Sequence, residues 1–452
     1  MQGQRHIVVL YVGFIVLWGL SVDHPDAPLR DYGFLKWFSA WATCLLVATT
    51  VAKNARGRLN IYGLSLPVCI LMAWVVLSAV RNGSTPGVTL VWLVFHLKYV
   101  FFLLYLNNLS LRVETVAVLL RATVILGSLL VVEGYIRTAL DLYDHPDQLS
   151  SFLGPHGTVN VGFVCCIAII YLTACALVKR KWSCLLLGFA LVSIAVPGEI
   201  KALTISGPLM AAVVYFAHAR GMSLRIPLAK WTFGCAVVGV VFWGLALLYL
   251  RFRNPETSVV MLTLIDNFQT WLREGGSLHE AQLNRLSTVA EVVVQLREDP
   301  TSFWLGRGPG ATFGSARQFV IEHHSWNQIG KMLADIGVMG TALYVWMLTK
   351  LSIPGWRMLK RLGSYEDKHR ILILTFAGVS VYYVVVAPMY DQVWRYDAVG
   401  FVFFALISGL YRLRMEAQAS SLAQFSFEEH EVPLCPSLPR DAGRWELQSG
   451  RF

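Results

Sequence analysis

Charged residues are scarce in this sequence. Asp, Glu, Lys and Arg make up 15% of the 452 residues and hydrophobic residues 56%, whereas a typical soluble domain is about 25% charged. A soluble protein of this length would need polar surface for about two or three domains, and the sequence has too little polar material to supply it. Lipid must therefore be the solvent for much of the surface.

The sequence also lacks the patterns that mark several other classes of protein. Seven of the 8 cysteines fall within long apolar runs and Cys435 lies in the C-terminal tail, so we expect no disulfide framework and no Cys/His metal site. No basic stretch is interleaved with exposed aromatic residues, so the net charge of +10 does not indicate nucleic-acid binding. We expect no metal and no other cofactor.

Long apolar runs are what the sequence does contain. A helix that spans a bilayer needs about 20 mostly apolar residues. About twelve such runs are present, and they lie at 6–22, 33–51, 61–80, 88–109, 115–136, 157–178, 182–197, 202–219, 229–250, 326–349, 370–388 and 396–413. The runs at 182–197 and 202–219 are short, and a re-entrant pair is the alternative there. The predicted fold is an all-α, polytopic integral membrane protein with about 12 transmembrane helices.

Charge placement predicts the orientation of these spans. Loops after even-numbered runs are rich in Lys and Arg, as at 179–181 and 350–370, whereas the short loops after odd-numbered runs carry few basic residues. Because cytoplasmic loops carry the excess of Lys and Arg, both termini are expected to be cytoplasmic. The first run fits this pattern as a retained span rather than a signal peptide.

Four regions follow from this topology. They are 1–250 with spans 1 to 9, a large outside loop at 251–325, 326–414 with spans 10 to 12, and a cytoplasmic tail at 415–452. The tail is polar and contains several prolines, so we expect it to be disordered.

The loop at 251–325 is the one long hydrophilic stretch. Ser277 to Glu280 is a capping-box pattern, and apolar residues then recur at helical spacing until Asp299-Pro300, where the helix should end. The residues of this stripe are Leu283, Leu286, Val289 or Ala290, Val293 and Leu296. A glycine-rich turn follows at 305–310, and His323 and His324 stand just ahead of the next span.

Arginines and acidic residues occur in nearly equal number within this loop, so an anion there must be held by individual arginines. Arg285 lies off the apolar stripe and Arg307 lies in the glycine turn; the alternative is that both are solvated or paired with nearby glutamates. Within the spans, ionisable residues are functional candidates because burying a charge is costly. Lys98 lies in the middle of the fourth span, beside His96.

The order of motifs in 283–340 resembles that of the bacterial O-antigen ligase and Wzy-type O-antigen polymerase superfamily. The shared pattern is an Arg-Leu at the start of an amphipathic helix, an Asp-Pro stop, a Gly-x-Gly-x-Gly turn, a histidine and a helix containing Gly-x-x-Gly. Here these are Arg285-Leu286, Asp299-Pro300, Gly306 to Gly310, His323-His324 and Gly337 to Gly340, and 154–160 resembles the family's Gly-Thr-x-x-x-x-Asn segment.

The sequence departs from the family pattern in three ways. The histidine spacing requires a two-residue insertion, and the arginine usual just ahead of the Gly-Thr segment is absent. The family's Ser-Arg pair appears as Ser206-Gly207, which leaves Lys201 as a substitute cation. These departures favour a polymerase over a ligase, since the polymerases vary more in sequence.

The resemblance implies a metal-independent membrane glycosyltransferase at the periplasmic face of the bacterial inner membrane. It would transfer an undecaprenyl-diphosphate-linked glycan to a sugar hydroxyl of a lipid-linked repeat unit. His324, or His323 beside it, would be the general base. Arg285 and Arg307 would hold the diphosphate, and Lys201 and Lys98 are further candidates for substrate binding. The expected partners are the lipid-linked oligosaccharide, the bilayer and other polysaccharide-assembly proteins.

Several alternatives remain open. A ligase that passes the same glycan to lipid A core, or a protein O-oligosaccharyltransferase, would share the donor chemistry. A transporter or flippase belongs to another class; Lys98 and the pair Lys331 and Asp335 would suit ion coupling, although no internal repeat is obvious. A metal-dependent glycosyltransferase would need an acidic pair in the first outside loop, where Asp23 and Asp26 lie.

Overall fold

The structure is a computed structural model. It describes residues 5–20, 34–35, 37–54, 60, 65–109, 111–140, 142, 153, 157–195, 200–222, 284–312, 327–390, 393–394 and 397–428. Within these ranges, the side chains of 18–19, 65, 201–202, 284–288, 390 and 419–428 are not described. Every element in the described ranges is a helix, so the all-α prediction is confirmed for them.

The chain divides into two units, Met1–Arg412 and Leu413–Phe452. The helices in the first half of unit 1 are α1 (His6–Leu20), α2 (Phe38–Lys53), α3 (Ser65–Arg81), α4 (Pro86–Asn108), α5 (Val113–Ala139), α6 (Gly157–Lys179), α7 (Trp182–Ser193) and α8 (Lys201–Gly221). The later helices are α11 (Asn284–Arg297), α12 (Pro300–Leu305), α13 (Gln328–Leu359), η5 (Leu362–Ser364), α14 (Asp367–Val381), η6 (Tyr382–Val386) and α15 (Ala387–Tyr390). The last helix, α16 (Asp397–Glu428), runs across the boundary into unit 2.

Most apolar runs of the sequence coincide with described helices, but α13 continues to Leu359, ten residues beyond the predicted run at 326–349, because residues 351–359 are also mostly apolar. Within the described residues, 6 helices are long and apolar enough to cross a membrane, and these are Pro86–Asn108, Val113–Ala139, Gly157–Lys179, Gln328–Leu359, Asp367–Met389 and Asp397–Gln418. Shorter apolar helices occupy the runs at α1, α2, α3 and α7. The run at 229–250 lies outside the described residues. The chain is therefore a multi-pass membrane protein.

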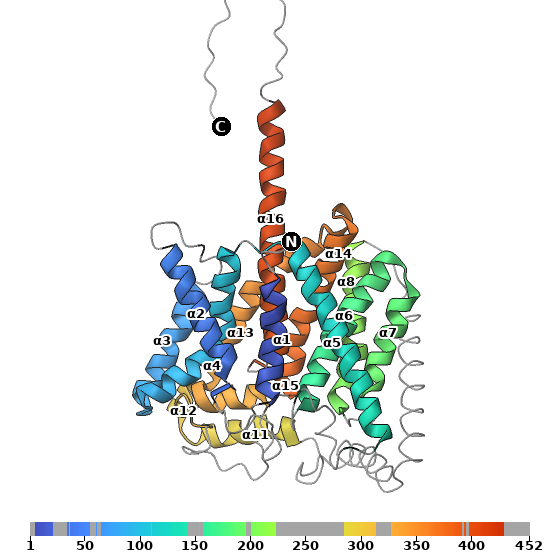
Figure 1. Ribbon diagram of the computed structural model, residues 1–452. Helices are drawn as coiled ribbons and strands as arrows, with labels where there is room; N and C mark the ends of the chain where they lie inside the picture. The colour runs from blue at the N-terminus through green and yellow to red at the C-terminus, as the bar shows by residue number, and fades with distance from the viewer. Residues whose placement is uncertain are drawn as a thin grey trace, which may run out of the picture. The chain divides into compact units, whose positions relative to one another are not determined.

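Helix α6 lies at the centre of one group of helices in unit 1. It packs against α5, α7, α8 and α14, which surround it in Figure 1. Glycines permit this close packing: a Cβ added at Gly378 of α14 would lie 2.6 Å from Cγ2 of Ile170 in α6. Small residues at helix contacts are the usual means of close approach in membranes, where lipid tails are as apolar as the side chains.

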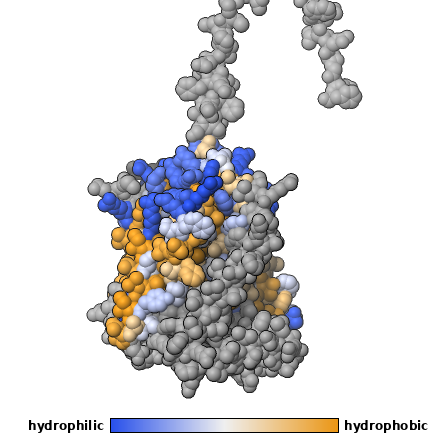
Figure 2. Space-filling view, turned by 90° about the vertical axis from the view of Figure 1, so that its right-hand side faces the viewer, coloured by the Kyte–Doolittle hydropathy of each residue, from blue (hydrophilic) through white to orange (hydrophobic). Residues whose placement is uncertain are grey.

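The outer flank of unit 1 is apolar. Large side chains such as Trp41, Val80, Trp182 and Leu186 are more than half exposed. Figure 2 shows hydrophobic residues on the flank and hydrophilic residues gathered above them. An exposed apolar surface of this extent would cause aggregation in water, and it fits a lipid bilayer.

One further sequence prediction needs correction, and two predictions about α11 are confirmed. The tail was expected to be disordered from 415, but α16 continues to Glu428; residues 415–428 are rich in helix-forming Ala, Gln, Glu and Leu, and the first proline comes only at Pro433. In α11, the predicted stripe is confirmed at Val289, Val293 and Leu296, and Ala290, the alternative to Val289, is exposed. The buried Val292 also belongs to the stripe. The predicted stop of α11 at Asp299-Pro300 is confirmed, since α11 ends at Arg297.

Candidate functional site

Helix α13 is broken at Gly337. This residue has φ 71° and ψ −175°, a non-helical conformation between two helical segments. A positive φ is strained for residues that carry a Cβ and is freely available to glycine. The Gly337-x-x-Gly340 motif therefore marks a discontinuity within a membrane helix.

The glycine turn after α12 is the second unusual backbone segment. Gly306, Gly308 and Gly310 all have positive φ, at 73°, 97° and 86°. The turn is preceded by a well-capped helix: Asp299 Oδ1 accepts a hydrogen bond from Thr301 N at 3.0 Å and Oδ2 accepts one from Ser302 N at 3.1 Å. The hydrogen bonds from Ser302 and Thr301 hold the pKa of the exposed Asp299 carboxyl below its usual range.

The glycine turn packs directly onto the break in α13. A Cβ added at Gly306 would lie 2.6 Å from the carbonyl oxygen of Asp335, and one added at Gly337 would lie 2.5 Å from Gly306 N. Only two glycines allow the backbones to come this close. Two motifs that the sequence places about 30 residues apart are thus in contact, and we call this contact the glycine junction (Gly306–Thr312 with Asp335–Gly337).

The break leaves carbonyl groups of α13 without helical partners, because the last four carbonyls of any helix lack them. Three groups from elsewhere in the chain supply the missing donors. Arg307 N donates to Ala334 O at 2.9 Å, Trp74 Nε1 donates to Ile336 O at 3.2 Å, and Ser78 Oγ lies 3.4 Å from Asp335 O. The junction therefore satisfies the polar groups that the break exposes.

Helix α3 also holds the glycine turn. Ser78 Oγ donates to Leu305 O at 2.6 Å, a shorter contact than its approach to Asp335 O. Asn82 Nδ2 donates to Gly306 O at 3.3 Å. Backbone groups of the turn are thus bonded both to side chains at the end of α3 and to the backbone of α13.

The carboxylate of Asp335 fixes the far end of the turn. It is fully buried, and it accepts hydrogen bonds from Trp92 Nε1 at 2.8 Å, from Thr312 N at 3.1 Å and from Thr312 Oγ1 at 3.1 Å. Lys331, one turn earlier on α13, adds a favourable electrostatic interaction with the same carboxylate. A buried charge needs this many partners to offset its lost hydration.

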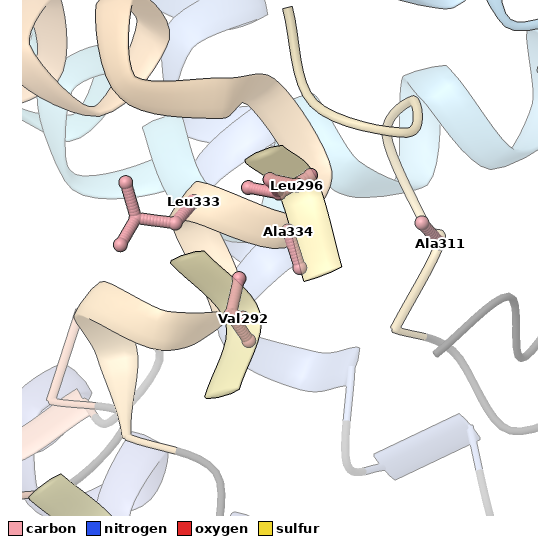
Figure 3. Packing of buried hydrophobic residues seen from close by; sticks show 5 residues of the cluster. All are labelled: Val292, Leu296, Ala311, Leu333 and Ala334. Atoms are coloured by element: carbon pink, nitrogen blue, oxygen red, sulfur yellow. The ribbon is translucent and has the colours of Figure 1, made fainter. Parts of the chain in front are cut away.

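Helix α11 closes the junction from the other side. Its buried Val292 and Leu296 pack against Leu333 and Ala334 of α13 and against Ala311 of the turn, as Figure 3 shows. A small apolar core therefore fixes α11 relative to the broken helix.

Arg307 is the one predicted site residue whose side chain the structure places at the junction. Its backbone is held by Ala334, its side chain is half-buried, and its guanidinium approaches Gln295 O of α11 at 3.4 Å. Arg285 lies in the first turn of the same helix, ten residues from Gln295, or about 15 Å along the axis. The side chain of Arg285 lies outside the described part.

The other predicted site residues are placed incompletely. Lys201 begins α8, but its side chain is not described. His323 and His324 lie outside the described residues, as do Asp23 and Asp26. Among the described residues there is no group of three or more His, Cys, Asp or Glu side chains that could hold a metal ion.

Lys98 lies apart from the junction, in a buried ion pair. Its ammonium contacts the carboxylate of Asp397 and donates to Ser39 Oγ at 2.9 Å. Tyr99 donates its hydroxyl to the same carboxylate oxygen. The charge of Lys98 is balanced within the protein, and its role in substrate binding stays a prediction.

Several residues that build the junction carry no motif that sequence reasoning could have found. Trp74 and Ser78 in α3 and Trp92 in α4 belong to ordinary apolar runs, and Asn82 lies in the short turn after α3. A polar or indole side chain in such a run indicates a partner but does not identify it.

Comparison with protein-family models finds no match for this chain, and comparison with curated proteins finds no significant similarity.

Proposed function

We propose that the chain is a membrane glycosyltransferase, a polysaccharide polymerase of the Wzy type. It would have about twelve spans, cytoplasmic termini and the 251–325 loop in the periplasm. It would transfer a glycan from undecaprenyl diphosphate to a sugar hydroxyl of the next lipid-linked repeat unit at the periplasmic face of the bacterial inner membrane.

The observation that carries the proposal is the glycine junction. The resemblance rests on the order of motifs between 283 and 340, and the junction brings two of these motifs, the turn at Gly306 and the break at Gly337, into contact. It fixes Arg307 beside α11, the helix that carries Arg285.

The short stretch of chain between the predicted histidines and α13 limits how far the histidines can lie from that helix. His324 is four residues before Gln328, the first residue of α13, and covalent geometry keeps their Cα atoms within about 14 Å. Arg307 N contacts α13 at Ala334, six residues further on, or about 9 Å along the axis. The Cα atoms of His324 and Ala334 are therefore at most about 23 Å apart, a limit that permits both regions to contact one lipid-linked glycan.

The proposed step is a glycosyl transfer in which negative charge develops on the departing diphosphate. The acceptor hydroxyl oxygen attacks the anomeric carbon, and the bond from that carbon to the diphosphate oxygen breaks. The hydroxyl proton passes to the imidazole of His324, a general base suited to neutral pH. Arg285 and Arg307 stabilise the charge of the departing undecaprenyl diphosphate.

Glycan profiling of a deletion strain tests the proposal against its nearest alternative. Loss of a polymerase leaves single repeat units attached to the acceptor, whereas loss of a ligase leaves long chains on undecaprenyl diphosphate. Long lipid-linked chains in the deletion strain would overturn the polymerase assignment.

The broken helix is also the observation that favours a transporter, because discontinuous membrane helices commonly line ion sites. The carbonyls at this break, however, already accept hydrogen bonds from Arg307, Ser78 and Trp74, and Asp335 is occupied by Trp92 and Thr312. A break whose polar groups are satisfied within the protein is better suited to shaping a loop than to coordinating a transported ion.

A further inference from the structure

A groove runs between α13 and α14 on the flank of unit 1. It has a volume of about 380 Å³, within the range of about 300–1,000 Å³ that is usual for ligand sites. A second hollow alongside α13 adjoins it at Thr349. Neither the groove nor the second hollow is lined by residues of the glycine junction.

Local irregularities in both helices open this groove. Pro354 lies inside α13, and η6 is a π-helical turn that continues α14; both features bend or widen a helix. On the inner side the two helices touch, since a Cβ at Gly355 would lie 2.6 Å from Cδ1 of Phe376. On the outer side they diverge, and Val384 and Val385 of η6 line the gap.

The walls of the groove present a mostly apolar surface to a ligand. Ile353, Val381, Val384 and Val385 contribute aliphatic surface. The hydroxyls among the lining residues are bonded to their own helices: Ser352 Oγ donates to Leu348 O at 2.9 Å, Thr349 Oγ1 to Val345 O at 2.8 Å, and Ser380 Oγ to Ala377 O at 3.0 Å. The interior therefore suits a hydrocarbon chain.

One end of the groove is cationic. Arg357 and Lys360 line it in the last turns of α13, one turn apart and exposed, next to Trp356. The nearby acids are engaged elsewhere, because Glu366 pairs with Lys368 at 3.1 Å and Asp367 pairs with Arg370 at 3.3 Å. In the described part of the chain, no ion pair joins Arg357 or Lys360 to an acidic side chain.

The dimensions match one leaflet of a bilayer. Thr349 and Lys360 are eleven residues apart on α13, which corresponds to about 16 Å along the helix. Half of the hydrocarbon core of a bilayer is about 15 Å thick. A chain that begins at the Arg357 end would thus run to about the middle of the membrane.

We propose that this groove binds an anionic glycerophospholipid, with its phosphate at Arg357 and Lys360 and an acyl chain between α13 and η6. Basic pockets between membrane helices recognise such headgroups, and a tryptophan beside them is typical of the membrane interface. The proposal is independent of the glycosyltransferase assignment, since it uses none of the residues of the glycine junction.

Native mass spectrometry of the purified full chain tests the lipid proposal. The measurement compares how much dioleoyl phosphatidylglycerol and how much dioleoyl phosphatidylcholine the protein retains. Wild-type protein should retain the anionic lipid preferentially. Arg357→Gln/Lys360→Gln should reduce the affinity for phosphatidylglycerol about 30-fold. The control Lys179→Gln/Lys181→Gln removes the same charge at exposed positions that do not line the groove, and it should retain the wild-type preference.

Val384→Trp fills the groove without changing the charge, and it should reduce binding although both cations remain; unfolding temperature in phosphatidylcholine shows that each variant is folded. Equal retention of the two lipids by wild-type protein, or equal loss in the two charge variants, would overturn the proposal. So would unchanged binding to Val384→Trp, because the acyl chain would then lie elsewhere. Binding of undecaprenyl phosphate is measured in the same way. A preference for it over phosphatidylglycerol would contradict the choice of a glycerophospholipid.

Discussion

Lys98 and Asp397 show how single residues carry charge inside this protein. Both side chains are 3% exposed, and Ser39 and Tyr99 add hydrogen bonds to the pair. Removing one partner of a buried ion pair typically costs about 3–5 kcal/mol, because the other charge remains buried without compensation. Replacing both partners by apolar residues of similar volume is often neutral.

Lys98→Met should therefore lower the thermal unfolding temperature of the detergent-purified protein strongly, and Lys98→Met/Asp397→Leu should recover most of the loss. If Lys98→Met unfolds at the wild-type temperature, the ion pair does not contribute to stability. The rate of glycan transfer by the stable double variant tests whether Lys98 binds substrate. A wild-type rate would show that Lys98 is not part of the substrate site.

The two loop arginines give a second prediction at this scale. Arg285→Lys and Arg307→Lys keep the positive charge but lose the fork of donors that matches diphosphate oxygens. We expect glycan transfer to fall about 10- to 100-fold, the effect of losing one charge-assisted hydrogen bond. Arg297→Lys, at the exposed end of α11, is the matched control. Wild-type transfer by Arg285→Lys would mean that Arg285 is an ordinary solvated helix residue.

At the scale of elements, the break in α13 depends on Gly337. An alanine there would be held at φ 71° and its Cβ would clash with the Trp304 carbonyl. The strained φ alone costs about 1–3 kcal/mol, so Gly337→Ala should lower the unfolding temperature. Gly13→Ala is the control, since nothing lies within 4 Å of its added Cβ and alanine is the better helix former. An unfolding temperature for Gly337→Ala that matches this control would contradict the account of the junction.

The sequence predicts the elements better than it predicts their contacts. Apolar runs locate the helices because spanning a bilayer constrains length and composition locally. The glycine turn and the Asp299-Pro300 stop are local too. The contacts that make the site, in contrast, join residues far apart in the sequence. Ser78 contacts Leu305, 227 positions away, and Trp92 contacts Asp335, 243 positions away. No periodicity within one helix specifies such a partner, so the junction could be recognised only in three dimensions.

At the scale of the whole molecule, charge placement predicts which side each loop faces. In a variant without native cysteines, a cysteine at position 275 should react with an impermeant maleimide in whole cells whose outer membrane has been permeabilised. A cysteine at position 365, between η5 and α14, should react only after lysis. The opposite labelling pattern would reverse the orientation and remove the loop arginines from the periplasm.

The catalytic assignment is the central claim, and it concerns the molecule as an enzyme. General-base catalysis contributes about 10²- to 10⁴-fold, and a single proton leaves the acceptor hydroxyl in this step, so only one of the two neighbouring histidines should serve as the base.

The most direct test is polymer formation by purified protein from purified lipid-linked repeat units, with folding of each variant checked by thermal shift. His324→Ala should reduce the rate about 10²- to 10⁴-fold, whereas His323→Ala should stay near the wild-type rate. Loss of activity in His323→Ala alone would move the base by one residue. Wild-type rates in both variants would contradict the proposed mechanism.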